Sequence, residues 1–280
     1  MTDKSLVRQL LNDLRSEDKK TQQSALHRLQ QIKDELTDPR NLPALMDALN
    51  QRDRHVRAFA VKLIGEIGDP TSVGALIERL MDRSKDVRKA AAEALGEIGE
   101  PEAVPALIGA LLGDENSFVR WEAARALGAI HSVEALPQLL EALSADANSY
   151  VRYAAAEALG NLGDQIALEG LENALLNDGN EFVRFAAAKA LGDIADPASV
   201  PSLLKALNTD NHHVWHAAAE ALWMLNEDAM PAVIEQLRDP DMEMRRAALK
   251  AVLWLTMEYD DEDAVLRDMP DWIDTLGWLN

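Results

Sequence analysis

The chain has 280 residues, of which 48% are hydrophobic, and a formal net charge of −20 at pH 7. It contains no cysteine, which excludes disulfides, thiolate metal sites and a cysteine nucleophile, and which is typical of a reducing compartment such as the cytoplasm. A protein that wraps DNA or RNA needs a basic stripe to neutralise phosphates, so this charge excludes nucleic acid as the expected partner. The N-terminus, MTDKSLVRQL, is too polar for a signal peptide, and no apolar run is long enough to span a membrane.

One motif recurs along the chain at a nearly fixed spacing. It consists of Val-Arg, a variable residue, an Ala-rich stretch, Leu-Gly, one further residue and Ile. Its seven copies begin at Val56, Val87, Val119, Val151, Val183, Val214 and Met244, in steps of 31, 32, 32, 32, 31 and 30 residues. Such a period indicates stacked units, each too small to bury its own apolar face. The sequence therefore predicts an all-α fold, a right-handed α-solenoid of about eight antiparallel helix pairs.

The predicted elements fall into three segments in chain order. Residues 1–39 are expected to form a divergent N-terminal capping repeat, because only a degenerate copy of the motif begins near Thr21. Residues 40–240 hold the regular repeats, and the whole solenoid is expected to extend over residues 1–257. Residues 258–280 predict an acidic, Trp-containing C-terminal tail or cap, since Glu258 to Asp274 carries eight acids against one Arg.

Each repeat is expected to contain a long helix followed by a shorter one. In the copy that begins at Val151, Asn148 suits a helix cap, and Val151, Ala155 and Leu159 form one apolar stripe. Gly163 then ends the helix and a shorter apolar helix follows. The many alanines of the motif predict that neighbouring long helices approach closely.

Two charged features recur with the repeat. An Asp lies five residues before the motif, at Asp82, Asp114, Asp146, Asp178 and Asp239. The second residue of the motif is an Arg, at Arg88, Arg120, Arg152, Arg184 and Arg245. We expect these residues to form a ladder that fixes repeat to repeat. The seventh motif residue alternates in sign, at Lys62, Glu93, Arg125, Glu157, Lys189, Glu220 and Lys250. This alternation predicts weak ion pairs between neighbouring repeats.

Aromatic and imidazole rings recur opposite the buried stripe. Four successive repeats carry a ring just before the first motif residue and another at the third position, giving Phe118 and Trp121, Tyr150 and Tyr153, Phe182 and Phe185, and His213 and His216. The two rings of a pair share a helix face. One interpretation is that they pack on adjacent repeats. The other, which we adopt, is an exposed aromatic groove on the concave face of the solenoid, where a partner binds.

The last repeats differ from the others in their tryptophans and histidines. Trp215 takes the position of the motif Arg and Trp223 that of the motif Gly, which suits either a terminal cap or a second docking patch. His212, His216 and Glu220 are spaced at i, i+4 and i+8, as in a divalent metal site. The same positions also continue the ring pattern, so we expect no metal there.

The strings VRYAAAEALG, EALGEIGEPEAVPALIGAL and KALGDIADPASVPSLLKAL resemble the HEAT-like repeats of the phycobilisome-lyase type over residues 40–240. Proteins with such repeats include subunits of phycobilin lyases, proteins of phycobilisome breakdown and accessory proteins of iron–sulfur assembly in cyanobacteria. The resemblance implies an adaptor that binds another macromolecule. Two alternatives stay open: a phycobilin lyase subunit or bilin-handling protein, with a bilin as ligand, and an accessory protein of iron–sulfur cluster assembly.

Catalytic motifs are missing from the sequence. Deoxyhypusine hydroxylase resembles these repeats but needs paired His-Glu motifs to hold its irons, and no His-Glu dipeptide occurs here. Nor is there a zinc-protease motif, a phosphate-binding loop or a serine nucleophile motif. We therefore expect a non-catalytic cytoplasmic scaffold without a cofactor, whose protein partner presents a basic or apolar docking surface; any activity would be of the bilin lyase type.

Overall fold

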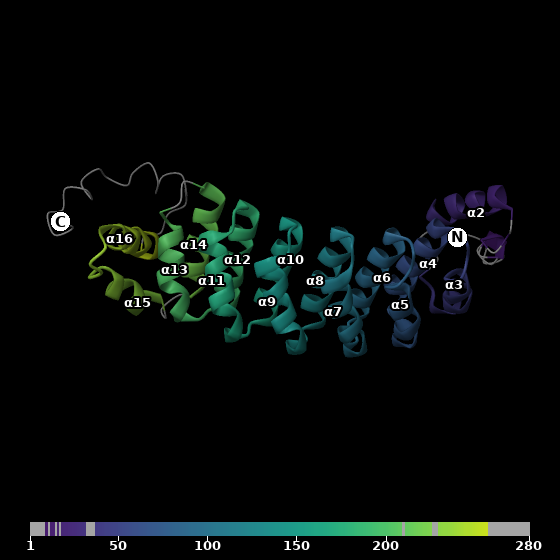
Figure 1. Ribbon diagram of the computed structural model, residues 1–280, viewed down its shortest axis with the longest axis horizontal. Helices are drawn as coiled ribbons and strands as arrows, with labels where there is room; N and C mark the ends of the chain where they lie inside the picture. The colour runs from purple at the N-terminus through teal and green to yellow at the C-terminus, as the bar shows by residue number, and fades with distance from the viewer. Residues whose placement is uncertain are drawn as a thin grey trace. The chain divides into compact units, whose positions relative to one another are not determined.

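The computed structural model describes residues 9–256 except residues 11, 15, 17, 32–36, 209–210 and 226–228. Every regular element within these residues is a helix, and the chain divides into two compact units, Met1–Gln138 (unit 1) and Leu139–Asn280 (unit 2). Figure 1 shows the helices following one another in chain order within each unit. The predicted all-α solenoid is confirmed. The acidic tail predicted for residues 258–280 lies outside the described residues.

Unit 1 contains long and short helices in alternation. Its elements are α2 (Lys19–Gln31), α3 (Leu42–Ala48), α4 (Arg54–Ile67), α5 (Val73–Arg79), α6 (Lys85–Ile98), α7 (Val104–Gly113) and α8 (Ser117–Ile130). The long helices α4, α6 and α8 pack side by side, and each of the short helices α3, α5 and α7 packs against the long helix that follows it. A short turn that contains an Asp joins α5 to α6 and α7 to α8, which holds each short helix close to the next long one.

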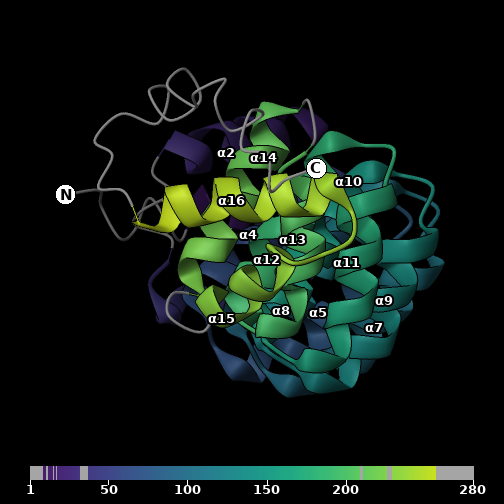
Figure 2. The same ribbon diagram turned by 90° about the vertical axis from the view of Figure 1, so that its left-hand side faces the viewer.

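Unit 2 follows the same plan. The helix α9 (Leu136–Ala145) spans the division between the units, and α10 (Ser149–Leu162), α11 (Leu168–Asn177), α12 (Glu181–Ile194), α13 (Val200–Ala206), α14 (His212–Met224), α15 (Ala229–Gln236) and α16 (Met242–Thr256) follow. The long helices α10, α12 and α14 pack side by side, with α11 against α12 and α13 against α14. Figure 2 shows α16 in front of α13 and α14, both of which it contacts. None of the described helices combines the length and the apolar character needed to cross a lipid bilayer.

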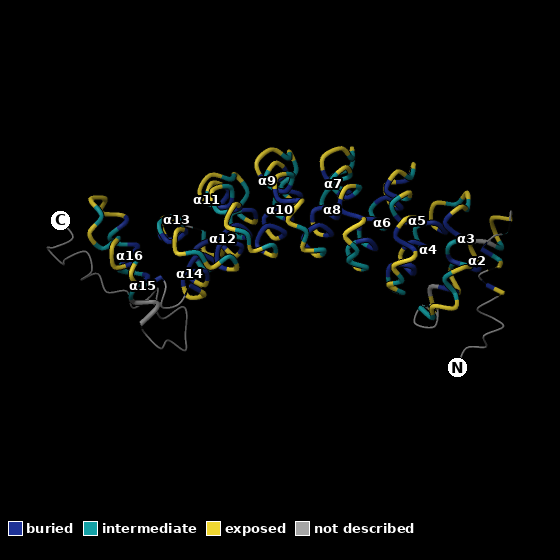
Figure 3. The backbone as a smooth tube through the Cα atoms, turned by 90° about the horizontal axis from the view of Figure 1, so that it is seen from below, coloured by how far each residue is buried: buried dark blue, intermediate teal, exposed yellow. Residues whose placement is uncertain are grey.

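The core of each unit lies between its long and short helices. Val151, Ala155 and Leu159 of α10 are fully buried, as the sequence stripe predicts, and Figure 3 colours the buried stretches of the long helices dark blue. The motif Gly sets the distance between neighbouring long helices. A Cβ atom placed on Gly160 would lie 2.9 Å from the Cα atom of Ala190. The dense alanines therefore do allow close packing, but together with a glycine of the preceding helix.

The predicted Arg–Asp ladder is present and links consecutive repeats inside each unit. Arg57 binds Asp82 at 2.7 Å, Arg88 binds Asp114 at 2.6 Å and Arg152 binds Asp178 at 2.7 Å, in each case with a second guanidinium N–H on the other carboxylate oxygen. The remaining amino group of Arg152 donates to the backbone carbonyl of Asp146 at 2.9 Å. One guanidinium thus holds the turn before its own helix and the turn of the next repeat.

The ladder shifts the pKa of Arg88, Arg152 and Asp178 from their ordinary values. The hydrogen bond from Arg88 to Asp114 raises the pKa of Arg88, and that from Arg152 to Asp178 raises the pKa of Arg152. Burial alone would raise the pKa of Asp178, but the guanidinium of Arg152 and the N–H of Asn180 outweigh it, so the pKa lies below its ordinary value. Arg152 and Asp178 are therefore both charged near neutral pH.

Several long helices end in a residue with left-handed backbone conformation. Gly68, Gly99 and Gly163 take this position with φ of 70°, 79° and 66°, whereas Ala195 adopts it with φ of 55°. A side chain in this region costs roughly 1 kcal/mol.

We therefore expect Ala195→Gly to raise the free energy of unfolding, measured in urea, by about 1 kcal/mol. The matched control Gly163→Ala, at the equivalent end of α10, is expected to lower it by a similar amount. A stabilising effect of both changes, or of neither, would contradict this account of the helix ends.

Candidate functional site

The two rings of each predicted pair differ in exposure. The rings at the second residue of a long helix, here called the N-terminal rings, are Phe118, Tyr150 and Phe182, and they are 56%, 67% and 58% exposed. Their partners Trp121, Tyr153 and Phe185 are half-buried. The side chain of the capping Asn accepts a hydrogen bond from the backbone N–H of each N-terminal ring residue, at 2.9 to 3.1 Å. The cap thus places every N-terminal ring at the same point on its helix.

The half-buried rings are covered by the residue one turn further along the same helix. The guanidinium of Arg125 lies 5.0 Å from the ring centre of Trp121, and the ammonium of Lys189 lies 5.9 Å from that of Phe185. The hydroxyl of Tyr153 donates to the carboxylate of Glu157 at 2.8 Å. Burial, and then this carboxylate, raise the pKa of Tyr153 to about 12.

This arrangement corrects the interpretation of the alternating charges. Within unit 2, no ion pair of the described residues joins Lys189 to Glu157 or to Glu220. The reason is distance, because residues four apart on one helix are about 5–6 Å apart at Cβ, whereas neighbouring helix axes are about 8–10 Å apart. In these three repeats the seventh motif residue, Arg125, Glu157 or Lys189, therefore contacts the ring of its own helix.

A buried carboxylate lies beside one of these rings in unit 1. Glu122 is 3% exposed, although five of the other six motif copies have Ala at its position. Arg125 donates to it at 2.9 Å and the ammonium of Lys89 lies 3.8 Å away. Burial raises the pKa of Glu122 although both cations oppose it. Lys89 also lies 5.5 Å from the ring centre of Trp121. Lys89 and Arg125, which both pair with Glu122, therefore both lie over this ring.

The sequence interpretation missed Glu122. The signal that could have found it is the fourth motif position, which holds Ala in most copies and an acid in this one. A buried acid in an Ala-rich seam needs cations beside it, and two are present.

In unit 2 the ring positions lie at equivalent points of three helices that pack side by side. The face of α10, α12 and α14 that carries Tyr150, Tyr153, Phe182, Phe185, His213 and His216 is called the ring face below. Its helices pack side by side, and His213 is exposed while His216 is half-buried. The predicted pair Phe118 and Trp121 belongs to unit 1.

The exposed charges along the same three helices are mainly acidic. Glu157, Asp193 and Glu220 are exposed against one exposed cation, Lys189. Arg152 and Arg184 are engaged at the adjacent turn, where both donate to backbone carbonyls.

The Trp and His residues of α14 divide into buried and exposed ones. Trp215 is 6% exposed, and its ring stacks on that of His212 with centroids 6.4 Å apart. It is therefore a packing residue in the position of the motif Arg, contrary to the docking role predicted for it. Trp223 is 65% exposed, as a docking residue requires. It fills the position of the motif Gly. The contact of α14 with α16 is smaller than that of α12 with α14.

The metal candidate does not form a site in the described structure. His212 and His216 have ring centroids 6.1 Å apart in an edge-on arrangement, and His212 is stacked on Trp215. Among the residues that the structure describes, no three His, Asp or Glu side chains are grouped to hold a metal ion.

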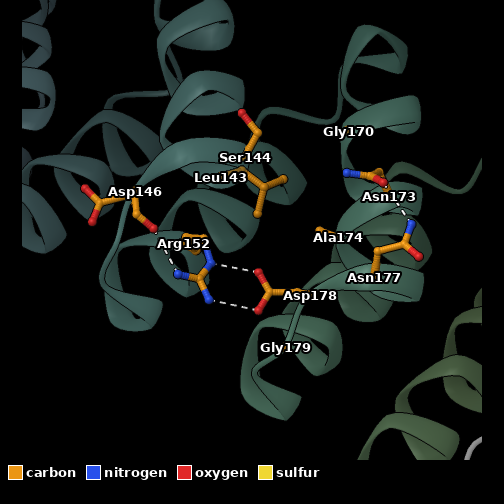
Figure 4. A pocket seen from close by; sticks show the side chains of 10 residues that line it. All are labelled: Leu143, Ser144, Asp146, Arg152, Gly170, Asn173, Ala174, Asn177, Asp178 and Gly179. Atoms are coloured by element: carbon orange, nitrogen blue, oxygen red, sulfur yellow. Dashed lines mark hydrogen bonds and ion pairs between the residues drawn. The ribbon is translucent and has the colours of Figure 1, made fainter.

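A recess of about 270 Å³ in unit 2 lies between the ends of α9 and α11 (Figure 4). The Arg152–Asp178 pair lines it, together with Asn177, whose amide donates to the side chain of Asn173 at 2.9 Å. No residue of the ring face lines it. The guanidinium of Arg152 is fully engaged with Asp178 and the carbonyl of Asp146, so this recess is part of the ladder between repeats.

Comparison with known proteins places this architecture in a family. The model for HEAT repeats matches residues 7–85, 73–159 and 136–223. None of the curated proteins compared with the sequence matches it.

Solved structures share the fold. An engineered protein is 24% identical, with a TM-score of 0.57 over 89% of this chain and 78% of its own. The complex of CpcE and CpcF of phycocyanin lyase from Nostoc sp. PCC7120 is 23% identical, with a TM-score of 0.50 over 89% of this chain and 93% of that chain. Kap95p, solved with RanGDP, is 18% identical, with a TM-score of 0.57 over 89% of this chain but only 41% of its own. At these identities the likeness extends to the fold alone, and with the family match it shows that the chain belongs to the HEAT-repeat family.

Proposed function

We propose that the chain is a non-catalytic scaffold that binds another protein on the ring face of unit 2. The observation that carries the proposal is the exposure of Tyr150 and Phe182, at 67% and 58%, on helices whose opposite side forms the core. Burying large exposed apolar rings against a partner lowers the free energy of the complex. Aromatic residues are also enriched among those that dominate the binding energy at interfaces.

The N-terminal rings are better candidates for binding than their partners. Tyr153 and Phe185 are half-buried and already contact Glu157 and Lys189 of their own helices. The rings of Tyr150 and Phe182 have no such contact in the described structure. A partner is therefore expected to gain the most binding free energy by covering Tyr150 and Phe182.

The buried charges of the described residues have structural partners. Arg57 and Arg88 are paired with the Asp of the next turn, and Glu122 is paired with Arg125 and Lys89. These groups hold repeats and rings in place, which supports a scaffold. The proposal places this binding in the cytoplasm, as the composition suggests.

Site-specific photocross-linking in the native host tests the proposal. A photoreactive residue at Tyr150 or at Phe182 is expected to cross-link one and the same protein. The control position is Ile166 in the 3₁₀ turn Gln165–Ala167, which is 69% exposed and lies off the ring face. Equal cross-linking from Ile166, or none from the ring positions, would contradict the proposal. A shift in bilin absorbance that disappears when Tyr150 and Phe182 are changed would instead favour the bilin alternative.

A further inference from the structure

We infer that the ring face recognises a basic, extended segment of its partner, whose cationic side chains come three residues apart and stack one by one on Tyr150 and Phe182. This inference rests on the proposed function, because it names the chemistry of the partner that the same face binds.

The first support comes from two other rings, Trp121 and Phe185, which lie under cations of the chain. Lys89 and Arg125 lie over Trp121 at 5.5 and 5.0 Å, and Lys189 lies over Phe185 at 5.9 Å. In the described part of the chain no cation lies over Tyr150 or Phe182. A cation over an aromatic face is attracted by the ring quadrupole. Tyr150 and Phe182, the most exposed rings of α10 and α12, thus lack the cation that Phe185 has in unit 2 and Trp121 has in unit 1.

The second support is charge complementarity. The exposed charges of α10, α12 and α14 are three acids, Glu157, Asp193 and Glu220, and one cation, Lys189, which is itself engaged over Phe185. Arg152 and Arg184, which follow Tyr150 and Phe182 by two residues, each donate to the backbone of the adjacent turn. A cationic segment therefore meets carboxylates along this face.

The third support is the repeat spacing. Tyr150 and Phe182 hold equivalent positions on two long helices whose close contact runs through Gly160 and Ala190. Helices packed in this way have axes about 8–10 Å apart. A segment in the polyproline II conformation has about three residues per turn and advances about 3.1 Å per residue, so side chains three residues apart share a face and are separated by about 9 Å. In a β-strand, side chains on one face are two residues and about 6.6 Å apart, which is too short.

The exposure of the rings favours an extended segment over a helix. An α-helix is about 10–12 Å wide with its side chains and is bound by laying one face into a groove. Tyr150 and Phe182 are 67% and 58% exposed, so they protrude from their helices. Protruding rings suit an extended chain that places one side chain on each.

The test uses the full chain and a fluorescent synthetic peptide with Arg at every third position and Pro and Ser between. Binding is measured by anisotropy at physiological salt. The variant Tyr150→Leu/Phe182→Leu keeps apolar bulk and net charge but removes both ring faces, and it is expected to bind the peptide about tenfold more weakly. The matched control Ile166→Ala is expected to bind like the unchanged protein. Circular dichroism verifies that each variant is folded.

Two peptide controls need no change to the protein. Citrulline in place of Arg removes the charge at nearly constant shape and is expected to weaken binding by about the same factor. A peptide with its Arg residues adjacent is expected to bind more weakly than the spaced one. Equal binding of either control peptide, or of the Leu variant, would overturn the inference. Because photocross-linking of the native partner does not depend on these peptides, the proposed function can stand when the inference fails.

Discussion

Replacing Gly160 with Ala is expected to lower the free energy of unfolding by about 2–3 kcal/mol. The new Cβ atom would lie 2.9 Å from both the Cα and the Cβ atoms of Ala190, and backbone atoms of a packed helix cannot move aside cheaply. The two helices would have to separate, which also opens the alanine seam beside them. Urea unfolding followed by circular dichroism measures the loss.

The matched control is Gly109→Ala in α7, where an added Cβ atom would meet nothing within 4 Å. That change is expected to stabilise the protein by about 0.5–1 kcal/mol, because Ala has the higher helix propensity. If the two substitutions change the free energy of unfolding in opposite directions, the close approach of the neighbouring helix is the reason for glycine at this motif position. A stabilising Gly160→Ala would contradict the close-packed seam.

Removing one partner of the Arg–Asp ladder is expected to have the largest effect. Arg152→Ala leaves the carboxylate of Asp178, whose side chain is 9% exposed, without its cation and should cost about 3 kcal/mol at neutral pH. The double change Arg152→Met/Asp178→Asn is expected to recover part of this loss, because Asn leaves no buried charge and can still accept from the N–H of Asn180. If the double variant is no more stable than Arg152→Ala, the unpaired carboxylate of Asp178 is not the cause of the lost stability.

The same pair predicts a dependence on pH. The pKa of Asp178 is lowered in the folded protein by Arg152 and the N–H of Asn180, against the effect of burial. A lowered folded pKa means that the pair stabilises the fold above the unfolded pKa, about 3.9, and that this stabilisation is lost as the pH falls through the folded value. The stability gap between the unchanged protein and Arg152→Ala should therefore be full at neutral pH and shrink on acidification, first because the buried Asp178 of the variant takes up a proton more readily without Arg152, and then, below about pH 4, because the unchanged protein loses its ion pair.

The sequence predicted the features that depend on period. The spacing of the motif predicted the stacked helices, and its Val, Ala and Leu positions predicted the buried stripe of α10. The Arg and Asp positions predicted the ladder, because a guanidinium and a carboxylate that recur together at a fixed offset favour a bidentate pair in every repeat.

The sequence did not predict which of several possible side-chain contacts forms, or which ring is buried. A helical wheel places Tyr150 and Tyr153 on one face but cannot show that Glu157 takes the second ring and leaves the first exposed. It cannot show that Trp215, in the position of an arginine, turns into the core. The burial of Glu122 could not be predicted without knowing that Lys89 of α6 and Arg125 of α8 both lie beside it.

We propose that the exposed rings of unit 2 serve binding, whereas the buried side of the long helices forms the core. The most direct test measures the free energy of unfolding and the binding of the cross-linked partner on one variant, Tyr150→Ala/Phe182→Ala. We expect stability within about 0.5 kcal/mol of the unchanged protein, because both rings are exposed. Binding is expected to weaken by more than about 2 kcal/mol, as for hot-spot rings. A variant that is much less stable and loses binding only through unfolding, or one that binds at full strength, would contradict this assignment.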